Sequence, residues 1–198
     1  MKKVRLTTIL VIVFISLTAI SCKNAKKENT HNDATHSEMN PDKMNKSKDK
    51  MDSNTQNSDA QKVLADYMAL KNALVETDKD KATKAGQKLM NTLSKFDASS
   101  YTAEQQKELK DIIADAKEHA EHIGRSAMDH QREHFKVLSK DIIDMVLITG
   151  TKDTLYQQFC PMYDNNKGGA WLSMNKEIRN PYYGSKMLKC GKVQREIN

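Results

Sequence analysis

The chain is poor in the residues that build several common kinds of site. Its 198 residues include only three cysteines, three prolines, seven glycines and one tryptophan. No Cys-x-x-Cys pair occurs, which argues against a zinc ribbon or thioredoxin-like redox chemistry. The sequence also lacks a nucleophile elbow, a glycine-rich phosphate loop and a His-Glu-x-x-His helix, so no motif supports catalysis. We expect a protein that is not an enzyme.

Long hydrophobic runs are scarce as well. The one such run, residues 6–17, follows three basic residues and is too short to be a comfortable transmembrane helix, which is typical of a secretory signal. Ser21 before Cys22 resembles the bacterial lipobox, in which the cysteine is diacylated with chains such as palmitate. We predict a signal peptide at 1–21 and a lipid anchor at Cys22 that holds the chain to the membrane, in the outer membrane facing the periplasm. Ordinary cleavage beside an incidental cysteine is the alternative.

The basic charge is weaker than it first looks. Removing residues 1–21 takes away three positive charges, so the net charge falls from +6 to +3. The remaining lysines alternate with Asp and Glu, which is typical of solvated helix surfaces. A nucleic-acid interface needs a clustered basic face with interleaved aromatics, and the sequence has none. We expect no nucleic-acid partner.

Residues 22–57 contain almost no large apolar side chain other than methionine. Such a segment cannot bury enough surface to offset the entropy of ordering it, so we predict a disordered tether. Imidazole and thioether groups in such a tract suit transient capture of Cu(I) or Ag(I), although a polar linker with chance histidines is the plainer interpretation. The residues concerned are His31, His36, Met39, Met44 and Met51.

Residues 58–150 carry apolar side chains with a 3.6-residue period, which predicts amphipathic helices. Capping boxes, which open helices, begin at Ser58 and Thr102, and Gly150 is a natural stop. We expect four helices, at about 58–76, 78–96, 102–123 and 127–148.

Helices of this length joined by short polar turns predict antiparallel neighbours. The predicted fold class is therefore all-α: an antiparallel up-down four-helix bundle at 58–150, followed by an irregular C-terminal cap at 151–198 of the same domain. Turn residues at 164–169 followed by an apolar run at 170–172 predict a short hairpin within the cap.

Two histidine pairs flank the turn between the third and fourth helices. His119 and His122 are three residues apart and His130 and His134 four apart, so each pair lies on one side of its helix. Antiparallel helices would place both pairs at the same end of the bundle. They could bind a metal or act as bases, but charged neighbours favour a surface role, with His134 the best exception because Phe135 beside it turns inward.

The other two cysteines, Cys160 and Cys190, enclose a loop of 31 residues in the cap. In an oxidising compartment a disulfide is the first hypothesis, and it would stabilise the fold by roughly 3.7 kcal/mol. The competing hypothesis is a soft-metal site in which the thioethers of Met162 and Met187 join the two thiolates to select Cu(I). The spacing does not choose between them.

The cap and the fourth helix contain a set of short motifs. They are Cys-Pro-Met at 160–162, Trp-Leu-Ser at 171–173, Ile178, Asn-Pro-Tyr-Tyr-Gly at 180–184, Met-Leu-Lys-Cys-Gly at 187–191 and the residues Gln131, Arg132, Phe135, Leu138 and Ser139. Together these motifs resemble a bacterial domain of unknown function, and the resemblance covers roughly residues 60–193. This domain occurs in small lipoproteins and is fused to periplasmic adaptor subunits of heavy-metal (copper/silver) efflux pumps. Cys-Pro-Met is also similar to the Cys-Pro-Met-His core of short metal-binding modules, with Tyr163 in place of the histidine.

The resemblance implies a metal context, with metal-efflux adaptors as candidate partners. Our leading hypothesis is a lipid-anchored periplasmic protein that binds copper-type ions and hands them over for efflux or resistance. Its expected ligands for Cu(I) or Ag(I) are Cys160, Met162, Met187 and Cys190, with His134 or His130 as an additional donor. The alternative is an interaction lipoprotein whose tail is stapled by a Cys160–Cys190 disulfide and whose aromatic surface docks a partner.

Overall fold

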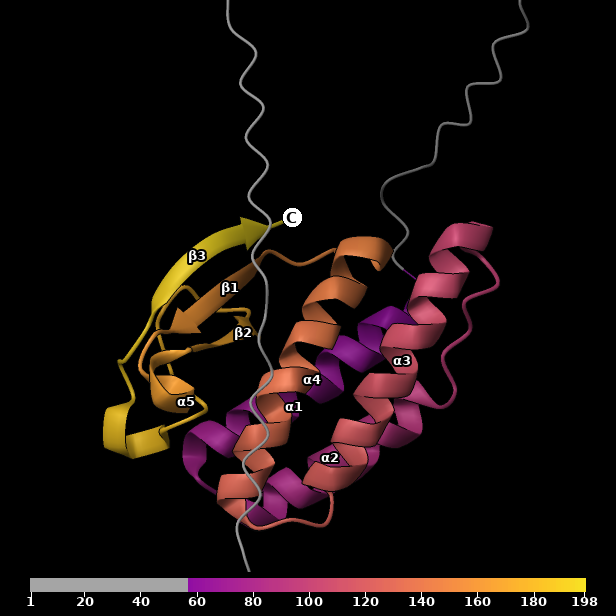
Figure 1. Ribbon diagram of the computed structural model, residues 1–198. Helices are drawn as coiled ribbons and strands as arrows, with labels where there is room; N and C mark the ends of the chain where they lie inside the picture. The colour runs from indigo at the N-terminus through magenta and orange to yellow at the C-terminus, as the bar shows by residue number, and fades with distance from the viewer. Residues whose placement is uncertain (1–56) are drawn as a thin grey trace, which may run out of the picture. The chain divides into compact units, whose positions relative to one another are not determined.

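The computed structural model describes residues 57–198. The predicted signal peptide, the lipidated Cys22 and the histidines and methionines of the tether lie outside the described residues. Four long helices come first and a small sheet follows (Figure 1). Within residues 57–198, no helix is long and apolar enough to cross a membrane.

The helices begin and end close to where capping chemistry predicts. Helix α1 spans Ser58–Glu76, and its cap is Asn57 rather than the predicted Ser58, because the Asn57 side chain accepts from the Asp59 N–H at 2.7 Å. Helix α2, Lys79–Leu93, is capped by Asp78, the first residue of the helix predicted at 78–96. Helix α3, Ala103–Ile123, opens with the predicted capping box of Thr102 and Gln105. Helix α4, Met128–Thr149, ends at Gly150, whose φ is 72°.

The helices bury one continuous apolar core. Helix α1 packs against α2 and α4, and α3 packs against the same two helices. The aromatic ring of Tyr67 on α1 stacks on that of Phe135 on α4, with centroids 5.4 Å apart. Each large side chain that is fully buried in this way contributes about 1.5–3 kcal/mol. The fully buried residues around this pair include Leu70, Leu74, Leu109, Ile123, Leu138 and Ile142.

The cap is a three-stranded antiparallel sheet with strand order β2-β1-β3. The strands are β1 (Leu155–Cys160), β2 (Gly169–Ser173) and β3 (Lys192–Ile197). A single turn, α5 (Tyr163–Asn166), connects β1 to β2, and a 3₁₀ helix, η1 (Gly184–Met187), precedes β3. The predicted hairpin is therefore confirmed, but the fold is not purely α-helical and the cap is not irregular, because β3 adds a strand that was not predicted.

The sheet lies beside α4, on the side away from α2 and α3 (Figure 1). The buried Tyr67 hydroxyl accepts from the Leu172 N–H at 3.1 Å and shares a hydrogen bond with Ser139 at 2.8 Å, so it joins α1, α4 and β2. Arg132 on α4 donates to the carbonyls of Pro181 (3.0 Å) and Leu74 (3.2 Å). These buried bonds make the helices and the cap one structural unit.

Candidate metal centre

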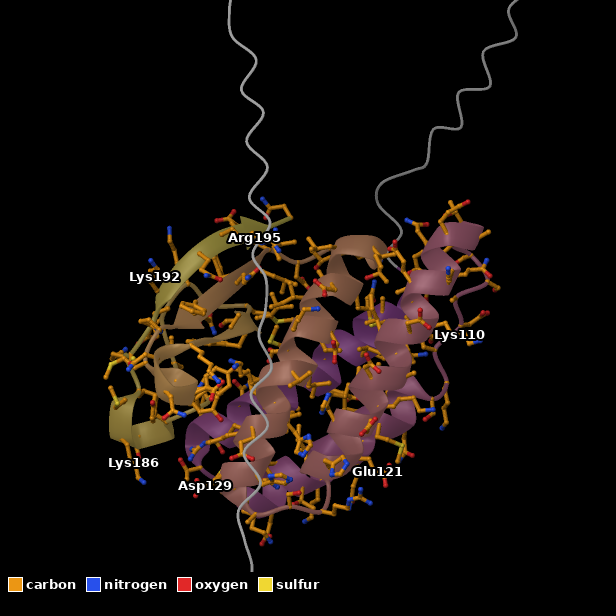
Figure 2. The ribbon with its side chains drawn as sticks, in the orientation of Figure 1. Lys110, Glu121, Asp129, Lys186, Lys192 and Arg195 are labelled. Carbon is orange, nitrogen blue, oxygen red and sulfur yellow. The ribbon has the colours of Figure 1, made fainter. Side chains whose placement is uncertain are left out.

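Four imidazoles meet at the end of the α3–α4 hairpin, and we call them the histidine cluster: His119, His122, His130 and His134. His134 lies in the middle: its Nδ1 is 2.9 Å from Nδ1 of His119, and its Nε2 is 3.0 Å from Nε2 of His130. The ring of His122 stacks on that of His134 with centroids 4.4 Å apart. Glu121 and Asp129, labelled in Figure 2, mark this end of the hairpin.

The α3–α4 turn is held in place by side chains from two helices, α2 and α4. The buried Gln131 amide donates to the Ile123 carbonyl at 3.1 Å and to the Thr83 hydroxyl at 3.0 Å. From α2, the Gln87 amide donates to the carbonyl of Gly124 at 3.0 Å. These bonds fix the crossing of α3 and α4, so the histidine pairs at i, i+3 and i, i+4 face each other across it.

The hydrogen bonds of the cluster define one set of neutral tautomers. The Glu133 carboxylate lies 2.8 Å from His130 Nδ1 and can only accept, so that nitrogen carries the proton. His130 Nε2 then accepts from His134 Nε2, and His134 Nδ1 accepts from His119 Nδ1. A carboxylate behind an imidazole is the usual partner of a metal-binding histidine, since it orients the ring and raises its basicity.

Electrostatics keep the central imidazole neutral. Burial is the largest cause that lowers the pKa of His134, to about 4, and the charges of His122, His130 and His119 lower it further against the opposing Glu133. Burial also lowers the pKa of His119, although Glu118 and Asp115 oppose it. Neutral imidazole is the form that binds metals, so at neutral pH His134 needs no deprotonation before it can act as a ligand.

The donor atoms are close enough to share one ion. Among residues 57–198, the group of three or more His, Cys, Asp or Glu residues that meets this condition is His122, His130 and His134, with ligand atoms within 4.8 Å of one another. His119 adds a fourth imidazole through its contact with His134. A set of imidazoles suits Cu, Zn, Ni or Fe, whereas Mg and Ca prefer oxygen.

The two cap cysteines also meet, but in a pair of their own. The Sγ atoms of Cys160 and Cys190 lie 3.0 Å apart as free thiols, with Cys160 fully buried at the end of β1. Their hydrogen bond, helped by burial, raises the pKa of Cys190 to about 11. Without a metal this thiol therefore stays protonated at neutral pH. The Asn180 side chain donates to the Cys190 carbonyl at 2.7 Å and fixes the backbone there.

The two methionines of the predicted soft-metal set lie between the two cysteines in the sequence, each within three residues of one of them. Met162 is 49% exposed and its carbonyl accepts from the Tyr183 hydroxyl, while Met187 is half-buried and its carbonyl accepts from the Cys190 N–H at 3.0 Å. The structure thus brings Cys160 together with Cys190. It also brings His130 and His134 together with His119 and His122. The last two histidines were not in the predicted ligand set, although their spacing on α3 was the sequence signal that could have included them.

A DUF3347 domain, described as a protein of unknown function, is found by its family model at residues 63–154. This range covers most of α1, all of α2, α3 and α4, and hence the whole histidine cluster, and it ends before β1. Searches of curated proteins and of solved structures gave no match.

Proposed function

We propose that this chain is a metal-binding protein of the bacterial cell envelope, which captures a copper-type ion in the histidine cluster and hands it over for efflux or resistance. The observation that carries the proposal is the placement of His122, His130 and His134 with ligand atoms within 4.8 Å. A fourth imidazole, a carboxylate behind His130 and the lowered pKa of His134 all support a set of neutral imidazole ligands, in which a bound ion would replace the hydrogen bonds between the rings.

The cellular setting is part of the proposal. The lipobox-like residues predict that Cys22 anchors the chain in the membrane, with residues 22–57 as the tether. The resemblance to domains fused to efflux adaptors makes such adaptors the candidate partners. We also infer that α1 to α4 form an up-down antiparallel bundle, supported by the contacts between consecutive helices and their short connections.

Copper is the favoured ion for the histidine cluster. Cu(II) binds nitrogen donors most tightly among the divalent first-row metals, and half-exposed imidazoles at a helix hairpin leave a route in for a solvated ion. The thiol pair of Cys160 and Cys190, with Met162 and Met187 nearby in sequence, is the candidate site for the softer Cu(I) or Ag(I).

The test is a calorimetric titration of the full chain with Cu(II). We expect one tight site whose affinity falls by about tenfold or more in His134→Ala and in His122→Ala. The matched control is the double variant His31→Ala with His36→Ala, which removes two imidazoles from the tether and should keep the tight site. The proposal fails if the His134 and His122 variants bind Cu(II) as the parent does, or if the tether variant alone abolishes binding.

A second function is favoured by the thiol pair alone. Sulfur atoms 3.0 Å apart are placed to be joined. A disulfide oxidant of the cell envelope would take up the two electrons and two protons that the thiols lose, and the new bond would staple the cap of a protein whose role is to bind a partner. The chain entropy removed from the unfolded state corresponds to roughly 3.7 kcal/mol. This function predicts a chain isolated without reductant that contains no free thiol at either position, and a lower melting temperature after reduction. Two titratable thiols in freshly isolated protein would contradict it.

A further inference from the structure

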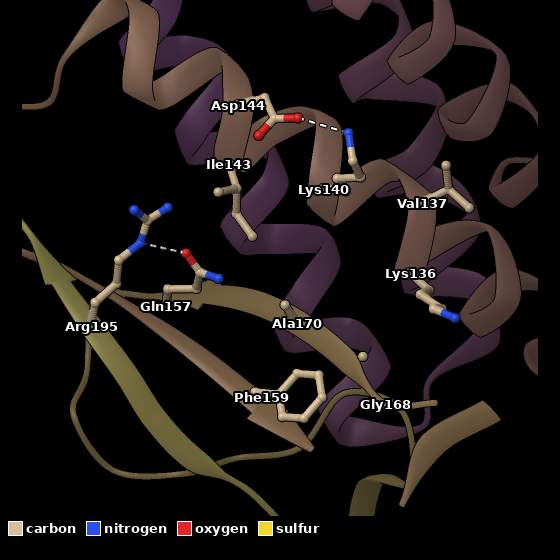
Figure 3. A pocket seen from close by; sticks show the side chains of 11 residues that line it. Lys136, Val137, Lys140, Ile143, Asp144, Gln157, Phe159, Gly168, Ala170 and Arg195 are labelled. Carbon is tan, nitrogen blue, oxygen red and sulfur yellow. Dashed lines mark hydrogen bonds and ion pairs between the residues drawn. The ribbon is translucent and has the colours of Figure 1, made fainter. Parts of the chain in front are cut away.

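A cavity of about 420 Å³ lies between α4 and the sheet, and no residue of the histidine cluster or of the thiol pair is among those that line it (Figure 3). One wall comes from α4 and includes Val137 and Ile143. The other comes from the strands and includes Phe159 and Ala170, with Arg195 of β3 at one side. This volume is in the range of small-molecule sites, which are roughly 300–1,000 Å³ and mostly apolar.

The cavity exists because small residues, Ala170 and Gly168, lie beside the ring of Phe159. Ala170 pairs with Phe159 in the β1–β2 register, so the strand face that looks toward α4 has only a methyl group there. A Cβ at Gly168 would lie 2.1 Å from the Phe159 ring, so the ring lies directly on the glycine backbone and forms a flat floor. Val137 also lines the cavity and is 41% exposed, so its apolar surface is accessible from the solvent.

The three basic side chains that line the cavity differ in whether they are paired with a carboxylate. Lys136 pairs with Asp164 at 2.5 Å and Lys140 with Asp144 at 2.8 Å. Arg195 instead donates from Nε to the neutral Gln157 side chain at 2.7 Å, and Figure 3 draws no interaction from its two terminal nitrogens to the other lining residues.

Arg195 therefore offers a forked pair of donors beside an apolar wall. Within residues 57–198, the exposed Arg195 side chain makes its hydrogen bond through Nε and none through its two terminal nitrogens. Two such nitrogens match the two oxygens of a carboxylate. The wall next to it matches a hydrocarbon chain, because each methylene that leaves water contributes about 0.8 kcal/mol. Together the cation and the wall suit a ligand with one anionic head and one apolar body.

We propose that this cavity binds a single amphiphilic anion, a medium-chain fatty acid, with its carboxylate on Arg195 and its chain against Val137, Ile143 and Phe159. The site is independent of the metal proposed above. It would give the protein a second ligand, one that is available beside a membrane.

The experiment is calorimetric titration of the full chain with decanoate below its micelle concentration, with decyltrimethylammonium as the probe of equal tail and opposite charge. We expect one saturable site for decanoate and no binding of the cation. Equal binding of both probes, or no saturable binding of decanoate, overturns the proposal. Attachment to vesicles of anionic lipid without binding of monomeric decanoate overturns it as well, because it would indicate a surface contact.

Two variants with matched controls locate the ligand. Arg195→Gln should weaken decanoate binding by about tenfold or more, whereas Arg179→Gln, an exposed arginine outside the cavity, should leave it unchanged. Val137→Asp places a negative charge on the wall and should abolish binding. Leu147→Asp changes another exposed apolar residue of α4, outside this cavity, and should not. Unchanged affinity in either cavity variant would contradict the assignment, and Val137→Asp keeps the test decisive should Arg195→Gln fail to fold.

Discussion

Asp141 on α4 is a buried carboxyl that makes stability depend on pH. The residue is 7% exposed, and within the described part of the chain its Oδ2 has no hydrogen-bond partner. Burial is the largest cause that raises its pKa from 3.8 to about 6; Asp115 and Asp144 add to the rise, and Lys140 opposes it. The pKa of Asp141 is higher in the folded state than in the unfolded state. Its contribution to the free energy of unfolding is therefore fully present below pH 3.8 and is lost as the pH rises through about 6. At neutral pH the loss is on the order of 2–3 kcal/mol.

The perturbation that isolates this effect is Asp141→Asn, which keeps the shape and removes the charge. Urea unfolding of the variant and the parent in chelator-treated buffer should give similar free energies near pH 4. Near pH 7 the variant should be more stable by about 2 kcal/mol. The lowered pKa of His134 destabilises both proteins as pH falls from 6.5 toward about 4, so it cancels in the difference. A difference between the two proteins that does not change with pH would refute the reasoning.

Two further substitutions test contacts of the cap, one with the helices and one within the cap itself. Tyr67→Phe removes the buried hydroxyl that accepts from Leu172 and should cost about 1–3 kcal/mol in urea unfolding. The control Tyr183→Phe removes an exposed hydroxyl and should cost less than about 0.5 kcal/mol; equal losses would contradict the role given to Tyr67. Gly168→Ala should lower the melting temperature because its Cβ would meet the Phe159 ring at 2.1 Å and its φ is +84°. An unchanged melting temperature would show that the ring is free to move.

The helices were predictable because their signals are local. Thr102 caps α3 in the structure as its capping box predicts, Asp78 caps the helix that was predicted to begin there, and apolar spacing fixes the buried faces. Strand β3 was not predictable in the same way. Val193 and Ile197 are the two apolar residues of this strand, and each is partly buried. The strand forms because it pairs with β1, which lies more than 30 residues away in the sequence. Such pairing depends on contacts that no sequence window contains.

The candidate site, too, was predictable only in its local features. Spacing alone predicted that each histidine pair shares a helix face and that the pairs lie at one end of the bundle. That all four imidazoles touch depends on the α3–α4 turn, which Gln131 holds through a hydrogen bond to the Ile123 carbonyl and Gln87, from α2, through one to the Gly124 carbonyl. The meeting of Cys160 and Cys190 depends likewise on the path of the chain between β2 and β3. Both contacts depend on the tertiary fold, so the sequence indicated only that these residue types could bind a metal or form a disulfide.

The most direct test of the central claim is anomalous diffraction at the copper edge from crystals of the chain exposed to Cu(II). The proposed function predicts an anomalous peak among His119, His122, His130 and His134, within coordination distance of at least three ring nitrogens. A peak at Cys160 and Cys190 alone, or no ordered peak at the α3–α4 turn, would contradict it.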